Sequence, residues 1–336
     1  MVFKTTLYLV LIGFILIYTN ADSQPRADYN LRFDTLASRW DEAIPIGNGW
    51  LGALIWQRDK KVRLSLDRVD LWDDRPMPII NQLKFRWVID QVHKNQYDTV
   101  QKIGDDPYEI NPAPTKLPAA AIEFNCSAFG RVTSNVLDLN SAIATIQFED
   151  GTIFRNYVHA TKKVGYFEIF NIPSEKQGHL PVEYIPEIKI PAYNENLTEK
   201  NDNSHSGGGL QTLNYSKGMV IKKGNSIRYH QPIWSGNYYE VLVQWHRIAS
   251  GIVGSWTITI NKAASLASLV LQSDRKKLLE THELWWKNFW NRSEVNIPDK
   301  QLARQYYLEV YKMGCVARSQ TPPISLQAVW TADNGK

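Results

Sequence analysis

The sequence predicts a mainly β protein, a large antiparallel β-sandwich followed by helices. Three features of the sequence support this fold class. Between Leu117 and Ile260, short alternating or β-branched runs follow one another at regular intervals, with turn residues between them. After Asp274 the apolar residues adopt the spacing of an amphipathic helix. A last helix, from about Asp299 to Arg318, is apolar around most of its circumference.

The first residues have the pattern of a secretory signal peptide. Lys4 precedes the apolar run 7–18, and the small residues that end at Ala21 provide a cleavage site. The run is shorter than the roughly 20 apolar residues that span a bilayer. We therefore expect residues 1–21 to be cleaved after Ala21, leaving a secreted or periplasmic protein with no membrane segment.

Two strands and one helix are expected at the start of the mature chain. The stretch Trp50–Trp56 is apolar enough for a buried strand, and residues 61–66 alternate with period two. Between residues 79 and 95 the apolar side chains recur at helical spacing, and these are Leu83, Trp87, Val88 and Val92.

The remaining strands are expected in close succession. They are predicted at 120–124, 131–139, 142–148, 152–159, 164–172, 182–190, 219–222, 226–231, 238–245 and 255–260. The dipeptide Asp150–Gly151 predicts a hairpin with a two-residue loop, which needs positive φ values. The polar, glycine-rich stretch 193–209 is expected to be a mobile loop. So many strands predict one sandwich domain, residues 22–273.

Two helices are expected after the sandwich. Residues 274–290 place Leu278, Leu279, His282, Trp285, Trp286 and Phe289 on one face, and Asp299 is placed to cap the last helix. That helix has a polar stripe of only Arg304, Gln305, Glu309 and Lys312. A helix this apolar needs cover on two or three sides. We expect residues 274–298 to be a linker and 299–336 to begin a further, truncated domain.

Composition argues against several classes of protein. The net charge is +4, and the longest basic run is Arg275–Lys277, so nucleic-acid binding is not expected. The histidines lack ligand spacing, so neither a metal nor another cofactor is expected. The two cysteines, Cys126 and Cys315, are expected to be buried free thiols. The 12 tryptophans fall into two clusters, which suit core packing or a sugar-stacking surface.

The stretch from Trp40 to Trp72, which opens WDEAIPIGNGWLGA, resembles the start of glycoside hydrolase family 95, the α-L-fucosidase and α-L-galactosidase family. Residues 117–124 and 137–145 resemble that family's next block. Residues 285–290, Tyr307 and residues 322–330 resemble the passage into its barrel. The resemblance implies a β-sandwich, a helical linker and the start of an (α/α)6 catalytic barrel. It implies hydrolysis of terminal α-linked sugars in an oligosaccharide or glycan, with inversion.

In that family a Glu acts as general acid, and an Asn polarised by an Asp positions the attacking water. The resemblance places these residues beyond Trp330. The pair Asp333–Asn334 does not match the Asn-x-Asn motif of the family. We therefore expect no catalytic residue in this chain, and no activity from it alone.

The carboxylates of the chain are expected to be structural. Inversion needs two carboxyl groups about 6.5–9.5 Å apart. Asp41 and Glu42 are expected on a strand, where neighbours point to opposite faces. The acidic cluster Asp67, Asp70, Asp73 and Asp74 ends in an expected turn at Asp73–Asp74.

Two residues remain as candidate contacts with a substrate. Asn48, between Gly47 and Gly49, is expected in a tight turn whose loop could form a wall of the substrate pocket. Trp330 could stack on a sugar, although packing is the competing interpretation. Two other functions stay open at this point. One is a stand-alone carbohydrate-binding module with tryptophans as its platform. The other is a sugar phosphorylase of the same architecture.

Overall fold

The computed structural model describes residues 24–109, 114–177, 186–189, 210, 213–265 and 272–331. The expected signal peptide, the expected loop 193–209 and the pair Asp333–Asn334 lie outside these residues. Within them, no helix combines the length and the apolar character that crossing a bilayer requires.

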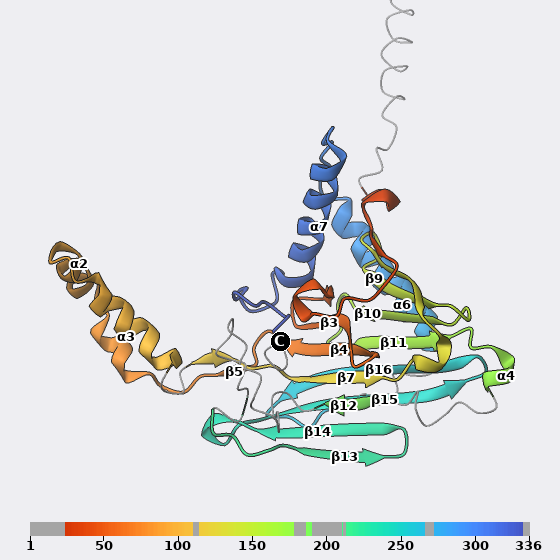
Figure 1. The fold of residues 1–336 in the computed structure, drawn as a ribbon, viewed down its shortest axis with the longest axis horizontal. Helices are drawn as coiled ribbons and strands as arrows, with labels where there is room; N and C mark the ends of the chain where they lie inside the picture. The colour runs from red at the N-terminus through yellow and green to blue at the C-terminus, as the bar shows by residue number, and fades with distance from the viewer. Residues whose placement is uncertain are drawn as a thin grey trace, which may run out of the picture.

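Two antiparallel sheets form the body of the molecule (Figure 1). The first has nine strands in the order β1 (Leu31–Phe33), β8 (Val132–Asp138), β9 (Ile143–Phe148), β10 (Ile153–Val158), β11 (Gly165–Phe170), β16 (Gly251–Ile260), β15 (Tyr238–Ile248), β14 (Ser226–Pro232) and β13 (Met219–Lys223). The second has five, in the order β12 (Glu187–Lys189), β7 (Ala120–Phe124), β4 (Lys61–Arg68), β3 (Leu51–Arg58) and β2 (Ile44–Gly47). The prediction of a mainly β, antiparallel fold is confirmed.

Aromatic side chains join the two sheets. The ring of Phe124 on β7 lies edge-on to Phe154 and Phe167 of the nine-stranded sheet, with centroids 4.8 and 5.0 Å apart. Trp256 on β16 is fully buried, and a Cβ at Gly165 of the neighbouring strand would lie 2.1 Å from its ring. Gly165 is therefore required for the packing of the indole. Such edge-to-face contacts add to the free energy that burial of these large rings contributes.

An arm of helices projects from the sheets (Figure 1). It comprises the 3-10 helix η3 (Pro78–Gln82), α2 (Phe85–His93) and α3 (Tyr97–Glu109), with the two-stranded ladder of β5 (Trp72–Asp73) and β6 (Thr115–Lys116) at its base. The sequence predicted one helix over residues 79–95, and the structure divides that span between η3 and α2. Helix α3 was not predicted, because Gly104 and Pro107 oppose a helical interpretation.

The two expected C-terminal helices are present as α6 (Gln272–Trp290) and α7 (Lys300–Val316). Asp299 caps α7, since its Oδ1 accepts from the backbone amides of Gln301 at 2.8 Å and Leu302 at 2.9 Å. Helix α7 buries Ala303, Tyr307, Tyr311, Gly314, Cys315 and Val316. The side chains of Leu302 and Met313 are more than half exposed, so the described residues cover this helix on one side only.

The β9–β10 hairpin differs in detail from its prediction. Only Gly151 of the Asp150–Gly151 pair has a positive φ, at +90°. The carbonyl of Phe148 accepts from Gly151 N at 3.0 Å, and Asp150 Oδ1 accepts from Thr152 N at 2.9 Å. The expected two-residue loop is thus a longer turn, in which the side chain of Asp150 supplies one acceptor.

Both cysteines are buried and free, as predicted. Burial raises the pKa of each thiol, that of Cys315 to about 11. A thiol with a raised pKa stays protonated at neutral pH and is a weak nucleophile. Cys126 and Cys315 therefore act as small apolar side chains.

Candidate functional site

The β2–β3 turn, which contains Asn48, is the centre of the candidate site. Asn48 Nδ2 donates to the carbonyls of His159 at 2.9 Å and Lys162 at 2.8 Å. Its Oδ1 accepts from the amides of Trp50 at 3.0 Å and Leu51 at 2.8 Å. The side chain is 3% exposed. The tight turn is confirmed, and Asn48 also fastens it to the β10–β11 turn.

Replacing Asn48 by alanine is expected to destabilise the protein by about 3 kcal/mol, because buried backbone groups in two turns lose their partners at once. Urea unfolding at neutral pH, followed by far-UV circular dichroism, measures this change. Asn288→Ala, at an exposed position on α6, is the matched control and should change stability by less than about 0.5 kcal/mol. A loss below about 1 kcal/mol in Asn48→Ala would contradict the assigned role.

The chain after α7 returns to this turn and packs on the five-stranded sheet. Val329 is fully buried, and a Cβ at Gly52 on β3 would lie 2.3 Å from its carbonyl oxygen. The indole Nε1 of Trp330 donates to Ile46 O at 3.0 Å. The amide of Thr331 donates to Asp67 Oδ2 at 2.9 Å. Strands β2, β3 and β4 therefore hold residues 329–331 in place.

Trp330 is half-buried, and its only donor is used by Ile46. This environment accounts for the indole by packing. Its contact with a sugar remains a prediction.

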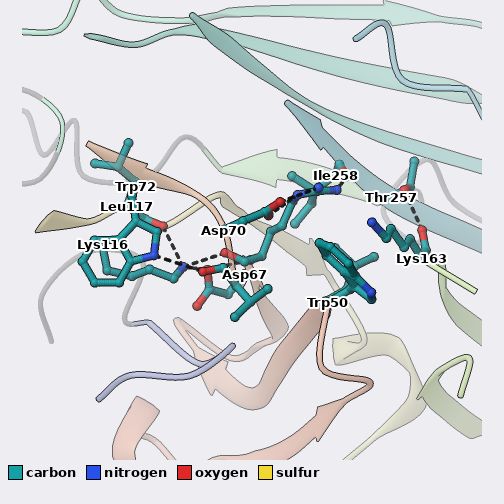
Figure 2. A network of polar contacts seen from close by, with 12 residues as sticks. Trp50, Asp67, Asp70, Trp72, Lys116, Leu117, Lys163, Thr257 and Ile258 are labelled. Carbon is teal, nitrogen blue, oxygen red and sulfur yellow. Dashed lines mark hydrogen bonds and ion pairs between the residues drawn. The ribbon is translucent and has the colours of Figure 1, made fainter. Parts of the chain in front are cut away.

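Asp67 forms a buried ion pair with Lys116 (Figure 2). Both side chains are at most 2% exposed. Lys116 Nζ donates to Asp67 Oδ1 and to Arg68 O, the latter at 2.8 Å. Burial raises the pKa of Asp67 and lowers that of Lys116, while their mutual attraction opposes both changes. The pair contacts the segment 329–331 that contains Trp330, because Asp67 accepts from the amide of Thr331.

Three other acidic residues, Asp41, Glu42 and Asp73, lie in places that differ from those expected. Asp41 and Glu42 lie in the 3-10 helix η2 (Trp40–Glu42), not on a strand, and Asp41 pairs with Arg39. Asp73 is fully buried at the end of β5, not in a turn, and accepts from Arg75 and from the hydroxyl of Tyr215.

A cleft of about 380 Å³ lies where the β2–β3 and β10–β11 turns meet α6 and α7. Asn48, Trp50, Ala160, Thr161, Trp285, Phe289, Arg292, Gly314, Ala317, Arg318, Ser319, Gln320 and Thr321 line it. These residues include two arginines and no carboxylate. The sequence did not indicate this cleft, because its walls come from four distant segments.

A second cleft of about 600 Å³ is lined by residues between Asp34 and Phe148, with Asp34 as its only carboxylate. Neither cleft brings together the two carboxyl groups that inverting hydrolysis requires. Within the described ranges, no three histidine, cysteine or acidic side chains are grouped so that they could hold a metal ion.

A family model matches the chain. Its description is "Glycosyl hydrolase family 65, N-terminal domain", and the match covers residues 31–201, just over half of the chain. The match begins at β1 and includes the whole five-stranded sheet. No curated protein matches the chain.

Proposed function

The chain belongs to the family of glycosyl hydrolase family 65 N-terminal domains. On that premise we propose that it forms the N-terminal part of an exported, inverting hydrolase of the family 95 type. The substrate proposed is a glycan with a terminal α-L-fucosyl or α-L-galactosyl residue. The observation that carries the proposal is the family match over residues 31–201. The ordered resemblance that begins at Trp40 supports the finer assignment.

The chemistry of this hydrolase is proposed to lie outside residues 24–331. Neither of the two clefts places two carboxyl groups on one bond, and the buried Asp67 and Asp73 are committed to Lys116 and Arg75. The proposed role of the β-sandwich is to hold residues 329–331 in place. These residues are proposed to lead into a catalytic barrel. The signal-like residues 1–21 support export.

The purified polypeptide of residues 22–336 is expected to leave an aryl α-L-fucoside and an aryl α-L-galactoside intact. The enzyme exported by the source organism is expected to cleave one of them and to release the β-anomer first, which proton NMR of the fresh product detects. Turnover by residues 22–336 would place the catalytic groups within this chain. Retention of the α-anomer would refute the family 95 type, and a strict requirement for phosphate would favour a sugar phosphorylase.

A carbohydrate-binding module is the second candidate function. The observation that favours it is the exposure of Trp234, 40% accessible, with the Arg75 guanidinium 5.0 Å from its ring centroid. An exposed indole is a stacking surface for sugars. Two results together would support this candidate instead. The protein would bind to a glycan array and lose that binding in Trp234→Ala, and the exported protein would show no hydrolase activity.

A further inference from the structure

The cleft between the turns and the two helices has an unusual electrostatic character. Arg292 and Arg318 line it, and among the described residues neither has a carboxylate within ion-pair distance. The lining contains no aspartate or glutamate. Because positive charge in a concave, partly apolar site is little screened by water, the cleft attracts anions.

The guanidinium of Arg318 is largely enclosed by protein atoms. Its Nε donates to Gly314 O at 2.7 Å, its Nη1 donates to Ala160 O, and its Nη2 is buried with no acceptor in the described structure. The guanidinium carbon lies 3.8 Å from the centroid of Trp285. Burial lowers the pKa of Arg318 to about 10, which leaves it charged at neutral pH. Arg318 is half-buried as a residue and its Nη2 is closed to solvent, so an anion in the cleft would stabilise the guanidinium by its charge and not by accepting from Nη2.

The rest of the cleft suits a sugar ring. Trp50 and Phe289 contribute apolar ring atoms to the lining, although Lys163 Nζ lies 3.0 Å from the centroid of the Trp50 ring and Trp285 is stacked on Phe289. Thr161, Ser319 and Gln320 provide hydroxyl and amide groups at the rim. A volume of about 380 Å³ lies within the range of small-molecule sites, about 300–1,000 Å³. Aromatic walls with a few polar groups are the usual lining of such sites.

We propose that this cleft binds an anionic saccharide, with its carboxylate on the exposed guanidinium of Arg292 and near the charge of Arg318, and with its ring against the apolar lining to which Phe289 and Trp50 contribute. Binding alone is assigned to this cleft, and no hydrolytic step is assigned to it. Its effect would be to hold the protein on acidic glycans. A peptide carboxylate would use the cations but would leave the apolar lining and the polar groups at the rim without partners.

Isothermal titration of residues 22–336 with α-1,4-digalacturonate tests the proposal. The carboxyl-reduced neutral disaccharide and inorganic phosphate are the comparison ligands. We expect digalacturonate to bind at least about tenfold more tightly than either, and to weaken severalfold between about 50 and 300 mM NaCl. Equal affinity for the neutral disaccharide, tighter binding of phosphate, or no binding of digalacturonate would overturn the proposal.

Arg292→Gln locates the binding in this cleft, because Arg292 is exposed and its loss should not affect folding. We expect it to weaken digalacturonate binding about fivefold to tenfold. Arg304→Gln removes the same charge from an exposed position on α7 that does not line the cleft, and should leave the affinity unchanged. Equal effects of the two substitutions would mean that digalacturonate binding depends on the net charge of the protein and not on this cleft. That result would also overturn the proposal.

Discussion

Lowering the pH from 7 to 5 is expected to reduce the free energy of unfolding by about 4 kcal/mol, about half from each of two buried histidines. His159 and His282 are both fully buried where α6 packs on the sandwich. Burial lowers the pKa of His159 to about 4 and that of His282 to about 3. The positive charges of Lys162 and Arg318 act in the same direction on His159 and His282, respectively.

The hydrogen bonds explain why both rings stay neutral. His159 Nδ1 accepts from the amides of Thr161 and Lys162, each at 3.2 Å, so a proton on this nitrogen would face two N–H groups. His282 Nδ1 accepts from Ala160 N at 3.1 Å, and its Nε2 donates to Ser141 O at 2.7 Å. These partners assign the proton of each ring to Nε2.

The direction of the pH effect follows from the lowered pKa values. The unfolded chain protonates each histidine near pH 6.5, whereas the folded protein does so only near pH 4 or below. The stability contributed by the neutral rings is therefore complete above about pH 6.5. It is lost as the pH falls toward 4, by about 1.4 kcal/mol per pH unit for each ring.

Urea unfolding between pH 7.5 and 4.5 measures this loss. His282→Asn keeps an acceptor near the position of Nδ1 and does not titrate, so the slope of stability against pH should fall by about half. His93→Asn, at an exposed position on α2, should leave the slope unchanged. An unaltered slope in His282→Asn would show that other groups cause the acid sensitivity.

The strands were predictable because the sequence patterns that indicate a strand lie within the strand itself and its adjoining loop. Residues 120–124 form β7 with the expected bounds, and most strands of the nine-stranded sheet differ from their predictions by only a few residues at each end. Alternation, β-branched residues and turn residues all act within one strand and its loop. The cap at Asp299 and the buried face of α6 were found for the same reason.

The site was less predictable because its contacts join distant segments. Asn48 was found as a turn residue, but its bonds to the carbonyls of residues 159 and 162 leave no pattern in the sequence. The cleft around Arg318 has the same origin, since its walls belong to four segments. Asp67 was assigned a structural role, yet its partner Lys116, 49 residues away, could not be predicted from spacing.

Substituting one member of the Asp67–Lys116 pair is expected to cost about 3–5 kcal/mol, because the other charge then stays buried without its partner. In Lys116→Met the carboxyl of Asp67 must take up a proton or remain unpaired. In Asp67→Asn the ammonium of Lys116 loses its counter-charge and keeps only neutral acceptors, namely the new amide oxygen and the carbonyls of Arg68 and Leu117, which lie at 2.8 and 3.4 Å. Urea unfolding of the two variants gives these values directly.

The double variant Asp67→Asn/Lys116→Met separates the ion pair from packing. If the pair is the cause, the double variant should lose at least about 2 kcal/mol less than the sum of the two single losses. Arg131→Met, which removes an exposed partner of Glu149, is the control and should cost less than about 1 kcal/mol. Additive losses in the double variant would mean that each side chain acts only through its own contacts.

Asp67 also has a role that Lys116 does not share, since only its Oδ2 accepts the amide of Thr331, at 2.9 Å. Asp67→Ala should therefore release residues 329–331 and speed amide exchange at Thr331 by at least about tenfold beyond the change in global stability. Lys116→Met leaves an oxygen acceptor at this position, so exchange at Thr331 should follow global stability alone. Equal acceleration in both variants would show that the segment is held by Val329 and Trp330 and not by the carboxylate.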